Sequence, residues 1–168
     1  MKRTPFKRST KPLKRTRLKM RGVSDASVLK EQIQHLLREI ALVRDKTCVL
    51  NDEEEAGKCG GYRKDGALVL QFDHLNSRTH AISFSDSRLG VLVCKRHHLY
   101  YKKQYPAQYE KLVRKAIGKA RCELLDKVRA DHKPYKVDLK LAIVGLTQEL
   151  NKLLDQDPEV KKLRNLTT

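Results

Sequence analysis

The chain has 168 residues, of which 39% are hydrophobic and 34% are charged, and it contains no tryptophan. This composition predicts one modest domain with a small apolar core, a kind of domain that gains stability from a bound metal. The formal net charge of +17 favours a polyanionic partner, most commonly nucleic acid, and leaves an anionic membrane surface as the alternative. No apolar run reaches the ~18–20 residues of a membrane span, and no signal-peptide core follows the basic start. We therefore expect a cytoplasmic protein without a membrane anchor.

Positive charge is concentrated at the N-terminus. Residues 1–22 carry ten basic side chains and no acidic one, so they repel one another and bury little surface. We expect a disordered tail that contacts DNA or RNA, with a merely solubilising arm as the alternative. The predicted contact residues are Lys2, Arg3, Lys7, Arg8, Lys11, Lys14, Arg15, Arg17, Lys19 and Arg21.

The remaining chain predicts an α+β fold. Apolar residues at helical spacing indicate a helix within 23–46 that packs on the core. Two short runs, 47–50 and 67–72, are β-like, and a polar stretch with glycines lies between them. Helical patterns return at about 95–103, 107–128 and 136–155. The organisation is therefore a tail (1–22), a helix (23–46), a small β-rich centre (47–103) and a C-terminal helical region (104–168).

Three cysteines and one histidine bracket the β-rich centre. Cys48 and Cys59 stand eleven positions apart, and Cys94 is followed three positions later by His97. Zinc takes four sulfur or nitrogen donors, and cysteines without a secretion signal favour metal binding over disulfides. We predict a structural Zn²⁺ site, with three buried thiols and no metal as the alternative. Cys122 lies in a helical pattern beside leucines and is expected to be a core thiol.

Asp73 and His74 follow the second β-like run directly, and His98 follows the expected zinc ligand His97. A carboxylate and an imidazole are suitable ligands for Mg²⁺ or Mn²⁺, so Asp73 and His98 are the candidate ligands of a catalytic cation. A neutral His74 could deprotonate an attacking water as general base. Asp73, His74 and His98 are therefore the candidate catalytic residues.

The segment DHLNSRTH (73–80), with Asp86 and CKRHH (94–98), resembles the HNH (ββα-metal) nucleases of the phage NinG/Rap recombination group. The resemblance covers roughly positions 45–130. It implies a small zinc-stapled ββα-metal core flanked by helices, with the zinc, cation and base positions assigned above. It further implies that Arg78 contacts a backbone phosphate near the scissile bond through its guanidinium fork, with a surface arginine as the alternative. His80 either assists Arg78 or shapes the loop.

One position departs from the HNH pattern. The middle asparagine of the signature, which ties the loop to the strand, falls on Leu89. Leucine offers no hydrogen bond, so we expect slow catalysis unless Asn76 or Asp86 supplies the tie.

The resemblance implies a metal-dependent DNA endonuclease acting on branched or looped DNA in phage or prophage recombination, inside a bacterial host cell, and we expect branched DNA or its single-stranded regions as the partner. The alternative is a non-catalytic zinc module that binds DNA or RNA. An RNA-binding antitermination or translation factor would explain the tail but not the Asp73, His74 and His98 set. The sequence leaves open the choice between monomer and dimer, and recruitment by a recombinase or single-strand-binding protein.

Overall fold

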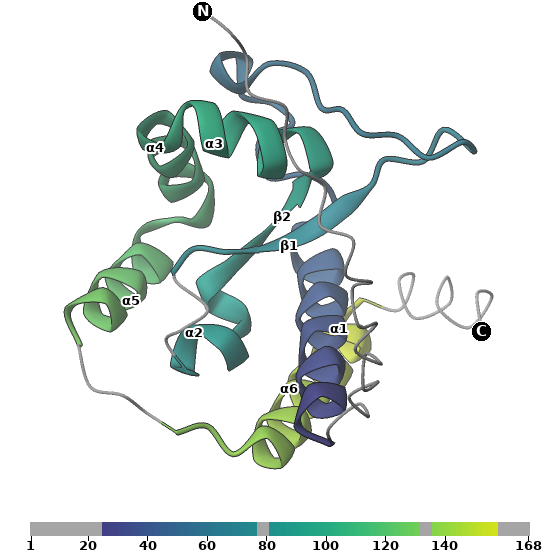
Figure 1. The fold of residues 1–168 in the computed structure, drawn as a ribbon, viewed down its shortest axis with the longest axis vertical. Coiled ribbons are helices and arrows are strands. Elements are labelled where there is room, and N and C mark those ends of the chain that lie inside the picture. Colours follow the sequence, from purple (N-terminus) through teal and green to yellow (C-terminus); the bar gives the residue numbers. More distant parts are fainter. Residues whose placement is uncertain (1–24, 77–80, 132–135, 158–168) are drawn as a thin grey trace, which may run out of the picture.

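The computed structural model describes residues 25–76, 81–131 and 136–157 (Figure 1). The basic tail, Arg78 and His80 lie outside these ranges, so their predicted DNA contacts remain predictions. The fold is α+β, with several helices around a two-stranded sheet, as expected from the sequence. Its elements are α1 (Asp25–Asp45), η1 (Glu54–Ala56), β1 (Leu70–His74), α2 (Ala81–Ser85), η2 (Ser87–Leu89), β2 (Gly90–Cys94), η3 (His97–Tyr101), α3 (Lys102–Gln104), α4 (Pro106–Ile117), α5 (Lys119–Ala130) and α6 (Leu139–Gln156).

The sheet consists of β1 and β2, which pair in antiparallel register from Leu70 opposite Cys94 to His74 opposite Gly90. Every residue of β2 is buried, so this strand has protein on both of its faces. Side chains alternate between the two faces of a strand. Neighbouring residues of β1 therefore enter different environments.

One face of the sheet packs against α1 and α6, which lie side by side in Figure 1. The apolar stripe of α1 supplies Ile33, Leu37 and Ile40, which are fully buried against Phe72 and Leu92. Helices α1 and α6 run in the same direction, and an ion pair of 3.1 Å between Lys46 and Asp157 joins their C-terminal ends. The two helices and this face of the sheet therefore form one apolar cluster.

The other face of the sheet meets α4 and the segment that follows α1. Val91 and Val93 pack there with Tyr109 and Val113 of α4. A smaller cluster forms where α5 covers η2, and its buried members are Leu89, Leu125 and Val128. The sheet therefore lies between a layer of α1 and α6 and a layer of α4 and α5.

Two sequence-based expectations for this region are wrong. The segment 47–50 is a turn rather than a strand: Asn51 N–H donates to the Cys48 carbonyl, and only Val49 N–H reaches β2, at the Leu92 carbonyl. The helix expected over 107–128 is two helices, because Gly118 has a φ of +77°, which ends α4 and lets α5 start in a new direction.

Within the part of the chain that the structure describes, no helix combines the length and the apolar character that a bilayer crossing demands.

Gly90 packs directly against the Phe72 ring and leaves no room for a side chain. A Cβ at Gly90 would lie 2.0 Å from Phe72 Cζ, so a side chain there must displace a buried aromatic ring. We expect Gly90→Ala to lower the free energy of unfolding by about 1–3 kcal/mol, measured by urea denaturation. Gly145→Ala is the matched control: its Cβ would meet nothing within 4 Å, and a helical alanine should stabilise by about 0.5–1 kcal/mol. A Gly90→Ala protein as stable as wild type would contradict this account of the packing.

Candidate metal centre and active site

Three segments bring Cys48, Cys59, Cys94 and His97 together. Cys48 follows α1, Cys59 lies in the loop after η1, and Cys94 and His97 flank the junction of β2 and η3. Their donor atoms all lie within 4.8 Å of one another, and His97 Nδ1 is 3.3 Å from Cys48 Sγ and 3.9 Å from Cys59 Sγ. In a tetrahedral site with Zn–S bonds of about 2.3 Å the sulfurs would lie roughly 3.8 Å apart, so the cluster needs only a small contraction.

The His97 ring is oriented by the loop that carries Cys59. Its Nε2 lies 3.2 Å from the carbonyl oxygens of both Ala56 and Gly57, so Nε2 carries the proton and donates it there. The lone pair of Nδ1 then faces the three thiols. A ligating histidine in proteins normally donates its second ring nitrogen in this way, which fixes the tautomer before the metal arrives.

Burial sets the charge of these donors. It raises the pKa of the Cys48 and Cys59 thiols, and it lowers the pKa of His97. Without a cation Cys48, Cys59 and His97 are therefore favoured in their neutral forms. A bound divalent cation stabilises the thiolates and a neutral imidazole, and zinc favours a Cys3His donor set. The cluster could hold a zinc ion.

A second set of polar groups surrounds Asp73, whose side chain is buried. Lys102 Nζ lies 2.7 and 2.8 Å from its two carboxylate oxygens, and Tyr109 donates its hydroxyl to Oδ2 at 2.6 Å. His98 Nε2 stands 3.8 Å from Oδ1. Burial and the Asp73 carboxylate raise the pKa of Tyr109, which keeps its hydroxyl protonated as the donor.

The π-helical geometry of η3 connects the two clusters. Lys102 N–H bonds to the His97 carbonyl, five residues back. The two consecutive histidines of η3 belong to different clusters. His97 contacts the cysteine thiols, and His98 lies beside the Asp73 carboxylate. Lys102, four residues after His98, reaches the same carboxylate. Single π-helical turns inside helices occur frequently at functional sites.

His74 lies elsewhere. Its Nδ1 is 3.0 Å from the Ser83 carbonyl, and its Nε2 is 3.2 Å from Gln34 Oε1 of α1. Phe72, on the same face of β1, meets the imidazole edge-on with ring centroids 4.9 Å apart. The side chain is buried between the sheet and α1.

The sequence-based grouping of Asp73, His74 and His98 is therefore met only in part. Asp73 and His98 are brought together, whereas His74 enters the opposite face of β1. Asp73 faces α3 and α4, and His74 faces α1, because adjacent residues of a strand point to opposite sides. The three residues could act on one substrate only if it binds at the C-terminal end of β1, where His74 is the last residue.

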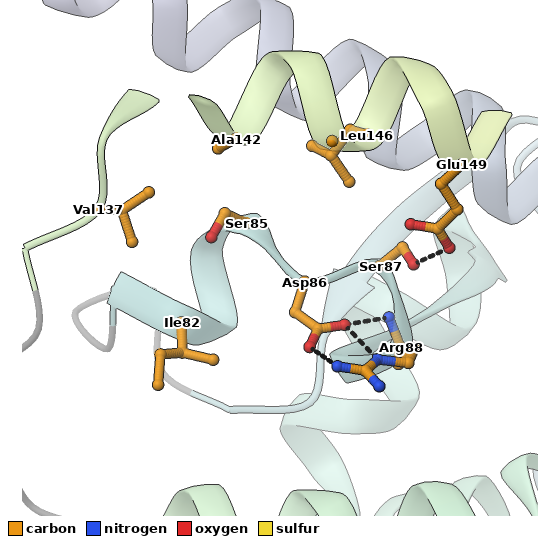
Figure 2. A pocket seen from close by; sticks show the side chains of 10 residues that line it. Ile82, Ser85, Asp86, Ser87, Arg88, Val137, Ala142, Leu146 and Glu149 are labelled. Atoms are coloured by element: carbon orange, nitrogen blue, oxygen red, sulfur yellow. Dashed lines mark hydrogen bonds and ion pairs between the residues drawn. The ribbon is translucent and has the colours of Figure 1, made fainter. Parts of the chain in front are cut away.

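Leu89 is a core residue, not a loop position that lacks its tie. It is fully buried with Leu125 and Val128, and its carbonyl accepts from Leu75 N–H. Asp86 does not supply a tie to His74, since its carboxylate accepts hydrogen bonds from the backbone and side chain of Arg88 (Figure 2). The expectation that Leu89 marks a missing catalytic asparagine is corrected accordingly.

A hollow of about 540 Å³ opens between α2, η2 and α6, away from both clusters (Figure 2). Ser87 donates to Glu149 at 2.5 Å on its wall. A smaller hollow of about 160 Å³ borders Lys102 and Tyr109, the partners of Asp73.

Three side chains of these clusters were missed by sequence reasoning: Lys102, Tyr109 and Gln34. The spacing of Lys102 four residues after His98 was a usable signal, whereas Tyr109 and Gln34 arrive through tertiary packing. Cys122 lies outside the metal cluster, half-buried, with its thiol directed at the Arg114 carbonyl at 3.3 Å.

Comparison with known proteins gives no match: no family model matches the chain, and neither does any curated protein or solved structure.

Replacing one thiol tests the metal centre. Cys94→Ser should release zinc and lower the melting temperature strongly, because structural zinc contributes folding free energy directly. Metal analysis and thermal melting are run on wild type, Cys94→Ser and the control Cys122→Ser. Zinc retained in Cys94→Ser, or lost equally in Cys122→Ser, would contradict the assignment.

Leu89→Asn tests the role of the core position. Burying an amide without partners among Leu125 and Val128 should cost ~1–3 kcal/mol of stability, measured by denaturant unfolding. A variant that is as stable as wild type and more active would restore the idea of a missing loop tie.

Proposed function

We propose that this protein is a metal-dependent DNA endonuclease of the HNH class, with a structural zinc at Cys48, Cys59, Cys94 and His97. One observation carries the proposal: the buried Asp73 carboxylate lies 3.8 Å from His98 Nε2. His98 directly follows His97, the proposed zinc ligand, in the sequence. A carboxylate and an imidazole on a rigid, metal-stapled frame form a suitable donor pair for Mg²⁺ or Mn²⁺.

The Asp73 site already holds a cation. The ammonium of Lys102 donates to both carboxylate oxygens, so it would compete with a divalent ion for Asp73. The Lys102 side chain is 38% exposed, and its long stem can withdraw into solvent. In the proposed enzyme, Asp73 and His98 hold the divalent ion after Lys102 leaves. When bound, that ion would stabilise negative charge on the reacting phosphate.

His74 remains the proposed general base, and its contact with the Ser83 carbonyl supports the required tautomer. Donation from Nδ1 to the Ser83 carbonyl leaves the lone pair on Nε2 to accept a proton. Gln34 Nε2 has no hydrogen-bond partner among the described residues. A Gln34 amide rotated by half a turn would donate this NH₂ to His74 Nε2. The proposal requires that a water bound with the DNA replaces Gln34 at this nitrogen.

Charge supports DNA as the substrate. The net charge of +17 and the ten basic residues of 1–22 favour phosphate binding. Arg78 and His80 are proposed to contact DNA near the scissile bond. The setting in phage or prophage recombination, with branched or looped DNA and a recombinase or single-strand-binding partner, rests on the resemblance at positions 73–98.

A second candidate function is a zinc-containing module that binds DNA or RNA without cutting it. Two observations favour it: Lys102 and Tyr109 satisfy the Asp73 carboxylate, and His74 is enclosed between the sheet and Gln34. In that protein Asp73 would be a structural carboxylate.

Plasmid nicking separates the two functions. Zinc-loaded wild-type protein should convert supercoiled plasmid to open circles only after Mg²⁺ or Mn²⁺ is added. Asp73→Asn should lose at least about 100-fold in rate, since the ion supplies several kcal/mol of charge stabilisation. His74→Ala should lose ~10²–10⁴-fold. Zinc content and melting temperature of each variant are the controls.

The outcomes are distinct. Absence of nicking by wild type under any divalent cation, with DNA binding intact, would establish the binding module. Loss of nicking in Asp73→Asn but not in His74→Ala would keep the enzyme and remove His74 as its base.

A further inference from the structure

The helical segment formed by η3 and α3 has two unlike sides. Its inward side carries His97, which is fully buried, together with His98 and Lys102, which reach Asp73. Its outward side carries Leu99 and Tyr100, which are 45% and 66% exposed. Two large side chains with apolar surface therefore stand next to each other in solvent.

Positive charge surrounds this outward side. Lys95, Arg96 and Lys103 are all exposed and lie three or four positions from Leu99 or Tyr100, which places them on the same side of the helix. Arg96 also donates to the Lys58 carbonyl, which holds the Cys59 loop beside it. The stretch from 87 to 109 contains no aspartate or glutamate, and a nearby acidic residue is Glu55 of η1, which acts electrostatically on Tyr101.

We infer that Tyr100, with Leu99 and the flanking Lys95, Arg96 and Lys103, is a stacking platform for single-stranded nucleic acid. An exposed ring with cations on both sides suits an unpaired base, whose face stacks on the ring while its phosphates meet the cations. A duplex covers its base faces, so it can use the cations but not the ring. The cations suit either form, and the exposed ring favours an unpaired strand over duplex DNA.

The platform lies on the same helical segment as the Asp73 partners. An α-helix is about 10–12 Å across with its side chains, so a strand on Tyr100 is separated from His98 and Lys102 by roughly one helix diameter. This inference deepens the proposed function, because it identifies the substrate region beside the candidate site as unpaired. It rests on that function only in taking nucleic acid as the ligand.

The test measures binding by fluorescence anisotropy with the full-length, zinc-loaded protein and no Mg²⁺ or Mn²⁺. The probes are labelled oligo(dT), oligo(rU) and a duplex of the same length. Tyr100→Ala should weaken binding of the single strands by about tenfold, the order expected for one lost base stack, and leave duplex binding nearly unchanged. Tyr100→Phe should retain single-strand affinity. Leu141→Ala, which removes a 70% exposed side chain from α6, should change neither.

A charge variant provides an independent arm. Lys103→Gln should reduce the slope of log affinity against log salt by about 0.7 on single strands and about 0.9 on duplex, because a phosphate contact is lost in both. Lys152→Gln on α6 is the control with the same change in net charge. The ratio of oligo(dT) to oligo(rU) affinity distinguishes DNA from RNA as the source of the strand.

Unchanged single-strand affinity in Tyr100→Ala would overturn the inference, as would equal weakening on single strands and duplex. Binding of anionic phosphatidylserine vesicles that depends on Tyr100, without single-strand binding, would reassign the surface to a membrane and also overturn it. If the protein does not nick plasmid but Tyr100→Ala weakens single-strand binding as expected, the nuclease proposal fails and this inference stands.

Discussion

The convergence of three thiols and one imidazole is the constraint on which the rest of the structure depends. Cys48, Cys59, Cys94 and His97 tie the end of α1, a long loop and the β2–η3 junction to one point. The described sheet has two strands, which is a small framework for a defined site. Because His97 is fixed by this cluster and by the Ala56 and Gly57 carbonyls, the rotation of η3 about its axis is fixed as well.

The directions of the other side chains on η3 and α3 follow from that rotation. His98 and Lys102 turn inward to the buried Asp73 carboxylate, and Tyr100 turns outward into solvent. A carboxylate in this position needs a cation or strong donors, because an unpaired buried charge is costly. Lys102 and Tyr109 meet that need in the structure. In the proposed enzyme a divalent cation would meet it in place of Lys102, and the bound cation would distinguish a catalytic from a structural role of Asp73.

The sequence predicted those features that depend on local spacing. The strong apolar period of α1 and the Cys94–His97 step are examples, since both are set within a few turns of chain. The turn at 47–50 resembled a strand because Val49 and Leu50 are apolar, yet tertiary contacts decide their conformation. The separation of His74 from Asp73 follows from strand alternation and was predictable once β1 was placed. Tyr109 and Gln34 reach Asp73 and His74 from distant helices, which no local pattern indicates.

We propose that Asp73 and His98 hold a divalent cation beside the Cys3His cluster. Calorimetric titration of Mn²⁺ into zinc-loaded protein, free of DNA, measures this binding without the complication of cleavage. We expect one Mn²⁺ site in wild type, its loss in Asp73→Asn with zinc content unchanged, and tighter binding in Lys102→Met, where the competing ammonium is gone. Mn²⁺ binding that is absent from both wild type and Lys102→Met, or unaffected by Asp73→Asn, would contradict it.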